Sequence, residues 1–138
     1  MFANNSTAGS AFIDLDHGSF LQFANNSTAA NSTIGTFFLS HVQFLDNSTA
    51  GSAFISVLDG SSLVFADRST AASANIFDGN GFIFFEGSSR GGTAQIHLRF
   101  IEGLIQFFPV LAIDHGVTIG SLEGDEMSVV GLGANNLT

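Results

Sequence analysis

The sequence contains no cysteine, tryptophan or tyrosine, and it has a single proline. Without cysteine, the chain can form neither a disulfide nor a thiolate metal site. The absence of cysteine is also compatible with export from the cell, where many bacterial proteins avoid this residue.

Positive charge is scarce as well. The 138 residues include 12 acidic and 3 basic residues, which gives a net charge of −9. A surface that follows the phosphates of a nucleic acid needs many Lys and Arg side chains. We therefore exclude nucleic acid and anionic membrane surfaces as partners.

Long apolar segments are missing too. The longest apolar run, residues 107–113, is far shorter than the ~20 residues that span a bilayer as a helix, so we expect no membrane insertion by this segment. The N-terminus has neither the charged region nor the apolar region of a signal peptide. Because the chain begins directly on a repeat and stops without a cap, we interpret it as a piece of a longer protein or as a unit that stacks on its own copies.

The sequence does contain a repeat of about 21 residues. Each copy opens with Phe, carries Ser-Thr-Ala four residues later, and continues with a small-x-Ile step. Repeats of this length indicate a stacked array, since one copy cannot bury its apolar face alone. The repeated positions are Phe2, Phe23, Phe44, Phe65 and Phe85 at the openings, and Ile13, Ile34, Ile55, Ile76 and Ile96 at the later step.

The later steps of each copy alternate with period two, as β-strands do, and turn-forming Gly, Asn, Asp and Ser separate them. We predict an all-β fold, a single-stranded parallel β-helix (β-solenoid) with about 21 residues per coil. Equal positions then stack about 4.8 Å apart. Residues 1–96 form the repeat coils, and residues 97–138 continue the solenoid less regularly. An antiparallel sandwich or barrel of short strands is the alternative.

The spacing between opening Phe residues is nearly constant. It is 21 residues three times, then 20 to Phe85 and 22 to Phe107. A change of one residue fits in a turn, whereas inside a strand it would move every following side chain to the other face. The spacing therefore places Phe107 in the same series as the earlier openings.

These residues resemble a known family. The phrase Phe-x-Asn/Asp-x-Ser-Thr-Ala-Gly-Ser-Ala-x-Ile is similar to the repeat in the passenger regions of bacterial autotransporters and related large surface proteins. Further along, residues 116–124 and 132–138 are similar to the Gly-Ser-Ile/Leu-Glu-Gly and Leu-Gly-x-Asn-x-Leu-Thr segments that follow the Ser-Thr-Ala array in those proteins. The copy at residues 85–94 resembles the variant that closes the array.

The resemblance implies a right-handed β-helix displayed outside a Gram-negative cell, and it carries no catalytic residue across. Three features depart from the family pattern. The C-terminal translocator barrel is absent, the second copy has Ser32 and His41 in place of Ala and Gly, and residues 125–131 are bulkier than the usual Gly-rich stretch.

Two polar columns have both functional and structural interpretations. Stacked Thr residues suggest an ice-binding face, which needs flat, regular rows of Thr, usually two on one strand, but here Ala follows each Thr. Hydroxyls that satisfy backbone groups at a turn are the simpler interpretation. Stacked Asn side chains stabilise turns through amide hydrogen bonds. Asp46 over Asp67 is a pair that could hold calcium through oxygens, although Arg68 could neutralise it instead. The calcium-binding nonapeptide of repeat proteins is missing, so we predict no metal and no cofactor.

The acidic residues do not converge on a catalytic pair. Hydrolases and lyases built on β-helices need converging carboxylates, or a base beside cationic partners. Here the acids are scattered; Asp14 and Asp16 alternate onto one face, but no matching pair recurs beside them. The three Arg and the four His occupy unrelated phases of the repeat. We therefore predict that the chain is not an enzyme.

Surplus phenylalanines are the remaining candidates for function. Phe12 and Phe54 lie between the inward Ala and Ile positions, so they should point outward, with Thr33 between them. Residues 37–39 and 82–85 add further apolar side chains. Exposed apolar area marks interaction surfaces, so Phe12 and Phe54 form a candidate interaction surface. The alternatives are a different phase, or a loop at about residues 97–115 that folds over this wall.

Two functions fit these observations. The first is a non-enzymatic structural or adhesive segment of a secreted or cell-surface autotransporter-like protein, outside a Gram-negative cell. The second is a self-assembling subunit that stacks end to end into an extracellular filament, since open strand edges template another chain. The expected partners are other copies of the chain, neighbouring repeats of a longer parent chain, or ligands on host or other cell surfaces.

Overall fold

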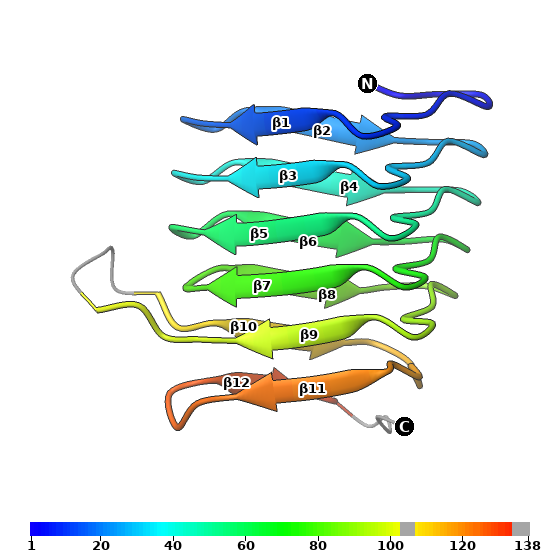
Figure 1. Cartoon of the computed structure of the whole chain (residues 1–138). Helices are drawn as coiled ribbons and strands as arrows, with labels where there is room; N and C mark the ends of the chain where they lie inside the picture. Colours follow the sequence, from blue (N-terminus) through cyan, green and yellow to red (C-terminus); the bar gives the residue numbers. More distant parts are fainter. Residues whose placement is uncertain (103–106, 134–138) are drawn as a thin grey trace.

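The computed structural model describes residues 1–102 and 107–133, which form a parallel β-solenoid of stacked coils (Figure 1). Its strands belong to two parallel sheets, in which neighbouring strands lie one coil apart in the sequence. The predicted all-β solenoid is confirmed, and an antiparallel sandwich or barrel is excluded. Among the described residues, there is no helix with the length and apolar character needed to cross a membrane.

Each coil contributes one strand to each sheet. From a strand of sheet 1 the chain passes through a first turn to a strand of sheet 2, and it returns through a second turn. Sheet 1 has the order β1 (Phe12–Leu15), β3 (Thr33–Thr36), β5 (Phe54–Leu58), β7 (Asn75–Gly79), β9 (Gln95–Leu98) and β11 (Ser121–Gly124). Sheet 2 has the order β2 (Phe20–Phe23), β4 (His41–Phe44), β6 (Ser62–Phe65), β8 (Phe82–Phe85), β10 (Val110–Ile113) and β12 (Val129–Gly131).

The register places equal positions of the repeat on one another. Phe44 pairs with Phe23 on one side and with Phe65 on the other. The stacked Phe rings are nearly parallel, and centroids of neighbouring rings are 4.7 to 5.0 Å apart. Equivalent Ile residues pair in the same way in sheet 1.

The structure places these two ladders in the interior. The fully buried members are Phe23, Phe44, Phe65, Phe85, Ile34, Ile55, Ile76 and Ile96. Phe2 and Ile13 belong to the first coil, are partly buried, and pack against the same core. Small side chains in the second turns, among them Ala29, Ala50 and Ala71, are fully buried as well. The core is therefore one continuous column that runs along the stack.

Phe107 does not open the sixth coil, so the prediction from its spacing was wrong. Ile113 pairs with Phe85 and takes the ladder position. The phase changes because the connection from β9 to β10 is longer than the equivalent connections in the other coils. Phe107 instead meets Phe82 edge-on, with ring centroids 5.7 Å apart, and lies beside Gly60, where an added Cβ would be 2.6 Å from its ring.

The interior Phe ladder can be tested by removing one ring. Phe44→Ala deletes a fully buried side chain, and we expect the free energy of unfolding, measured by urea denaturation, to fall by about 3–5 kcal/mol. The matched control is Phe12→Ala, because Phe12 is 73% exposed. This control should change stability by less than about 0.5 kcal/mol. Equal losses in the two variants would contradict the observed assignment of inner and outer faces.

Candidate functional site

The second turns carry a column of residues in the left-handed backbone region. We call Asn4, Asn25, Asp46 and Asp67 the second-turn column, and their φ angles are 56° or 57°. Asn and Asp tolerate this region better than most other L-residues. In the fifth coil Gly87 takes the equivalent position, with φ of 68°. The local sequence therefore fixes the shape of this turn in every regular coil.

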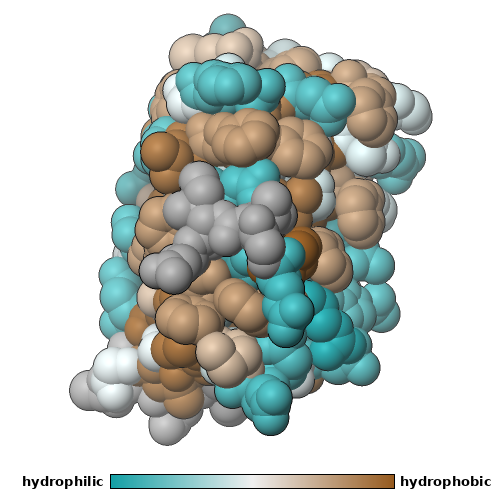
Figure 2. Space-filling view, turned by 90° about the vertical axis from the view of Figure 1, so that its left-hand side faces the viewer, coloured by the Kyte–Doolittle hydropathy of each residue, from teal (hydrophilic) through white to brown (hydrophobic). Residues whose placement is uncertain are grey.

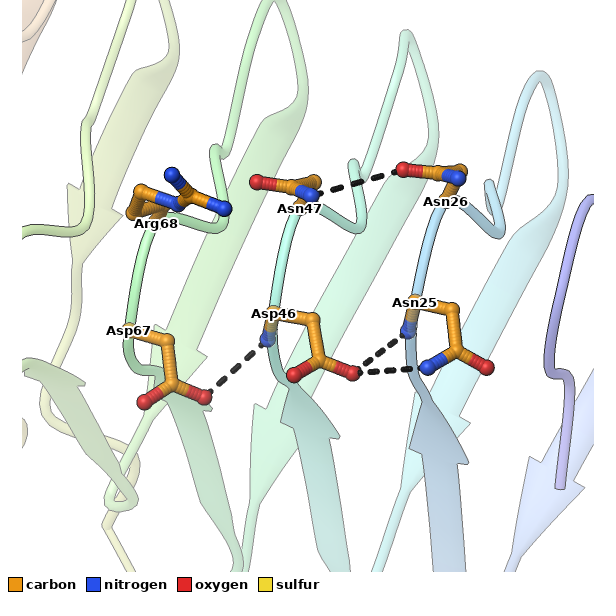
Figure 3. A pocket seen from close by; sticks show the side chains of 6 residues that line it. All are labelled: Asn25, Asn26, Asp46, Asn47, Asp67 and Arg68. Carbon is orange, nitrogen blue, oxygen red and sulfur yellow. Dashed lines mark hydrogen bonds between the residues drawn. The ribbon is translucent and has the colours of Figure 1, made fainter.

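The side chains of Asn25, Asp46 and Asp67 each accept the N–H of the column residue in the preceding coil, and Figure 3 shows the two bonds to Asp46 and Asp67. Asn25 Oδ1 accepts from Asn4 N at 3.0 Å, and Asp46 Oδ2 accepts from Asn25 N at 2.8 Å. Asp67 Oδ2 accepts from Asp46 N at 3.1 Å. Hydrogen bonds to a carboxylate are stronger than those between neutral groups, so Asp46 and Asp67 tie consecutive coils together.

A second polar column lies beside the first. The amide of Asn26 donates to Asn5 Oδ1 at 3.4 Å, and the amide of Asn47 donates to Asn26 Oδ1 at 3.5 Å. Arg68 takes the next position and lines the same shallow recess (Figure 3). These contacts are those of an Asn ladder between stacked turns.

The two acids considered for calcium, Asp46 and Asp67, lie in this recess. Each already uses Oδ2 to accept a backbone N–H. Within residues 1–102 and 107–133, no cluster of three or more His, Cys, Asp or Glu side chains is placed to hold a metal ion. The arrangement therefore serves to join coils.

The Ser-Thr pairs divide between the interior and the turn. Ser27, Ser48 and Ser69 are fully buried. Thr residues form single-residue bridges between coils, and each Thr Oγ1 accepts the N–H two residues later at 2.9 to 3.0 Å. The Thr hydroxyls thus satisfy backbone groups at the turn, as in other Ser/Thr turn motifs, whereas within the described part of the chain Ser48 Oγ and Ser69 Oγ are buried without a hydrogen-bond partner.

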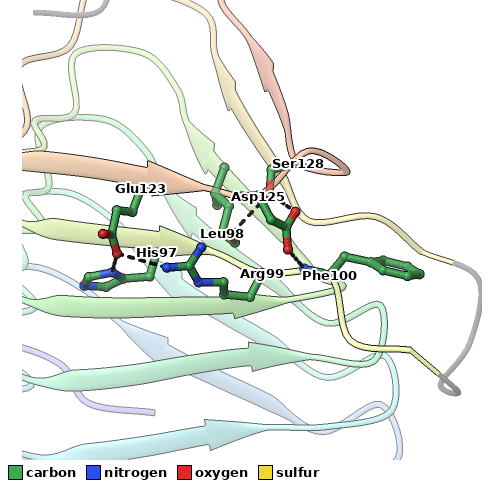
Figure 4. A network of polar contacts seen from close by, with 7 residues as sticks. All are labelled: His97, Leu98, Arg99, Phe100, Glu123, Asp125 and Ser128. Atoms are coloured by element: carbon green, nitrogen blue, oxygen red, sulfur yellow. Dashed lines mark hydrogen bonds and ion pairs between the residues drawn. The ribbon is translucent and has the colours of Figure 1, made fainter.

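The outer face of sheet 1 carries an ion network between β9 and β11 (Figure 4). His97 Nδ1 lies 2.9 Å from Glu123 Oε2, and Arg99 Nη2 donates to the same oxygen at 3.2 Å. The hydrogen bond with His97 is the main cause that lowers the pKa of the Glu123 carboxyl, and the charge of Arg99 adds to it. The network therefore links the fifth and sixth coils.

Asp125 extends this network to the following turn. It accepts the backbone N–H of Phe100, which is the main reason that the pKa of Asp125 is lowered. Ser128 Oγ lies 2.8 Å from Asp125 Oδ1 and 3.1 Å from the Leu98 carbonyl oxygen. These contacts close the sixth coil against the fifth where the long connection leaves β9 (Figure 4).

Asp114 and His115 form a further ion pair in a second turn. Asp114 Oδ2 accepts the Gly87 N–H at 3.1 Å, just as the column side chains accept the N–H of the preceding coil in the earlier turns. His115 Nδ1 lies 2.5 Å from Asp114 Oδ1, and Nε2 lies 2.8 Å from the Ser89 carbonyl oxygen. Partial burial lowers the pKa of His115, but the hydrogen bonds to Asp114 and Ser89 outweigh it, so the pKa is raised.

The candidate interaction residues Phe12 and Phe54 lie on the outer face of sheet 1. Their exposed fractions are 73% and 43%, and Thr33 pairs with both and separates them. The structure also exposes Phe20 on sheet 2, at 55%, which the sequence analysis did not single out. The sequence does indicate this exposure, because side chains alternate along a strand and Phe20 comes directly before the inward Leu21.

The edge formed by the first turns carries further apolar surface. Figure 2 looks onto this edge and shows apolar and polar patches intermixed. Phe38 and Leu39 are exposed in one of its turns, at 43% and 51%. The long connection between β9 and β10 contributes Phe108, whose ring centroid lies 5.5 Å from that of Phe100. Of the loop considered at residues 97–115, positions 103–106 lie outside the described residues.

Comparison of the chain with family models, with curated proteins and with solved structures finds no match. The resemblance to autotransporter passengers therefore depends on the motifs in the sequence. Residues 134–138 of the downstream motif lie outside the described residues.

The second-turn column can be tested at Asp46. Asp46→Ala removes the acceptor for Asn25 and places Ala at φ 56°, so we expect a loss of about 2–4 kcal/mol in unfolding free energy by urea denaturation. Asp46→Gly accepts the backbone angle and should lose only the hydrogen-bond part, about 1–2 kcal/mol. Asp46→Asn should be close to the parent protein. A neutral Asp46→Ala variant would contradict the structural function of the column.

Proposed function

We propose that the chain is a non-enzymatic structural and adhesive segment of a bacterial cell-surface protein. The observation that supports this best is the single register of the stack, in which strands of both sheets pair with their equivalents in the next coil. Repeat arrays of this kind are extended and have nearest-neighbour contacts only. Such a segment holds its outward side chains at fixed positions along one axis.

The outward apolar side chains support the adhesive part of the proposal. Phe12 and Phe54 lie on the same outer face of sheet 1, and they are 73% and 43% exposed. Exposed aromatic rings on a rigid surface bury area on contact with little loss of conformational entropy. The Ser-Thr-Ala motifs and the lack of cysteine support a location outside the cell.

Display on a laboratory bacterium tests this proposal. The full chain is fused to a surface anchor, and we expect the cells to settle from suspension faster than cells that carry the anchor alone. The double variant Phe12→Ser, Phe54→Ser should lose at least half of this gain, because it removes both rings from sheet 1. Attachment of the same cells to a cultured cell layer is measured in parallel.

The matched control for this experiment is Phe20→Ser, which changes the same kind of residue on sheet 2. It should settle like the parent, with surface amounts checked by antibody labelling. Settling and attachment equal to the anchor alone would count against an adhesive function. A double variant that behaves like the parent would remove Phe12 and Phe54 from the contact.

A second candidate function is end-to-end self-assembly. Among the described strands, β1 and β2 lie at one edge of their sheets, and β11 and β12 lie at the other. The end coils also carry partly buried apolar side chains, among them Ile13 and Leu122. Strand edges of this kind can pair with another chain. If a second copy continued the register, its Asp14 would stack next to Glu123 of the first copy in one outward column.

This column makes self-assembly sensitive to charge. Like charges one coil apart repel, and salt screens them, so we expect the mass from light scattering to increase with salt concentration. Asp14→Asn should shift association to lower salt, while Asp16→Asn serves as a control that leaves the column unchanged. A mass of 14.4 kDa at every salt and protein concentration would rule this second function out.

A further inference from the structure

One inward column of sheet 1 changes from apolar to acidic in the fourth coil. Asp78 pairs with Val57 on one side and with Leu98 on the other, and all three side chains are fully buried. Equivalent positions in the first two coils hold Leu15 and Thr36. A carboxyl group in such a place is costly when it is ionised, unless it is paired.

The hydrogen bonds of Asp78 do not compensate for a full charge. Oδ1 accepts the Gly81 N–H at 2.6 Å, while Oδ2 is buried without a hydrogen-bond partner. Burial raises the pKa of Asp78 to about 7, against the opposing effect of the Gly81 and Val110 N–H groups. In the neutral acid, the proton occupies one of these oxygens and removes the buried charge.

Among residues 1–102 and 107–133, no cation faces this carboxyl. Strands β5, β6, β8 and β10 contain no titratable side chain. On β9, His97 points outward to Glu123. Arg99 donates its backbone N–H to the Asp78 carbonyl oxygen at 2.8 Å, but its guanidinium also binds Glu123. Two further acids lie in the elements around this turn: Asp59, which is 4% exposed, and Glu102, which is exposed in the segment 99–102. Neither supplies a positive charge.

The Asp78 turn holds the start of the long connection after β9. Asn80 is fully buried, its Oδ1 accepts the Ile101 N–H at 2.9 Å, and its Nδ2 donates to the Ile101 carbonyl oxygen at 2.6 Å. The Ile101 side chain also packs on Gly79, where an added Cβ would be 2.5 Å from Cδ1. A change in the Asp78 turn is therefore transmitted directly to residues 99–102.

We propose that Asp78 is a proton-operated latch: the neutral acid keeps the turn at residues 78–81 closed on residues 99–102, and ionisation opens this contact. In the open state water solvates the carboxylate, so its pKa returns toward the ordinary value of 3.8. The closed state thus binds the proton more tightly than the open state. The stabilisation of the closed state by this proton is therefore complete below pH 3.8 and is lost as the pH rises through about 7.

The size of the effect follows from this linkage. Between the open-state and closed-state pKa values, the equilibrium constant for opening increases about tenfold per pH unit. Above about pH 7 both states are ionised, so the constant becomes independent of pH. From about pH 5 to pH 7 the equilibrium constant for opening should therefore increase by roughly 50- to 100-fold.

Hydrogen exchange measured by NMR on the full chain tests the latch. Protection factors, corrected for the intrinsic pH dependence of exchange, are followed at the Arg99 and Ile101 amides. In the parent protein, we expect the protection factors of these two amides to fall roughly 50- to 100-fold from about pH 5 to pH 7. The Leu45 amide, which donates to the Phe23 carbonyl oxygen in coils away from Asp78, should not show this fall. The carboxyl carbon of Asp78 should titrate near pH 7 in the same samples.

Two variants remove the titrating group in different ways. Asp78→Val introduces the residue that the preceding coil has at this position, Val57, and Asp78→Asn keeps a neutral polar group. Both variants should make the protection factors at residues 99 and 101 independent of pH over this range. Asp59→Asn is the matched control for a buried acid and should keep the parental dependence. A third variant, His115→Gln, is needed because the raised pKa of His115 also makes the folded state more stable at lower pH. The pH dependence that remains in this variant does not come from His115.

Two results would overturn the proposal. One is an Asp78 carboxyl carbon that titrates near pH 4 in the folded protein, close to the ordinary value of 3.8. The other is a pH dependence at residues 99 and 101 that persists in Asp78→Asn. Because Asp78→Asn conserves size and polarity, it decides the matter even if Asp78→Val does not fold.

Discussion

Backbone pairing between coils is the constraint on which the rest of this structure depends. It fixes the distance from each strand to the next at about 4.8 Å and places every side chain on its own equivalent in the neighbouring coil. The Phe rings illustrate this, since they stack nearly parallel with interplanar angles of 4° to 13°. Isolated aromatic pairs favour offset or edge-to-face arrangements, so the backbone ladder here sets the geometry of the rings.

The same constraint acts differently on polar groups. Amide side chains stack favourably because one end donates and the other accepts, whereas stacked acids repel unless they bond to something else. Asp46 and Asp67 resolve this by accepting backbone N–H groups. Where Gly87 and the long connection interrupt the regular columns, hydrogen bonds between Asp114 and Gly87 and between His115 and Ser89, together with the ion pairs of Glu123, hold the coils together.

The sequence predicted the features that recur at the same position of every repeat. The Phe and Ile ladders could be assigned because identical residue types recur at one spacing and parallel pairing brings them together. Phe107 was misplaced, since the phase after β9 depends on the length of a connection that the repeat does not specify. For the same reason, the contact of Asp114 with Gly87 spans 27 residues and has no counterpart in the repeat.

Asp78 was a different kind of omission. Leu15, Thr36, Val57 and Asp78 recur every 21 residues, so the sequence contained the signal that this acid occupies an inward column. The spacing of the acids relative to one another does not indicate this, because only the mostly apolar residues at the equivalent positions mark the column as inward. In a solenoid, the phase of a polar residue relative to its apolar equivalents is therefore as informative as its distance to other polar residues.

The identity of neighbouring coils in the first half of the chain has a consequence for how such a protein can evolve. Residues 2–8 and residues 23–29 are identical, and every contact of one coil is made with a coil of nearly the same composition. An in-frame duplication or loss of one unit therefore leaves a surface that still matches the next coil. The length of the rod can change one strand spacing at a time, while its cross-section and the chemistry of its faces stay the same.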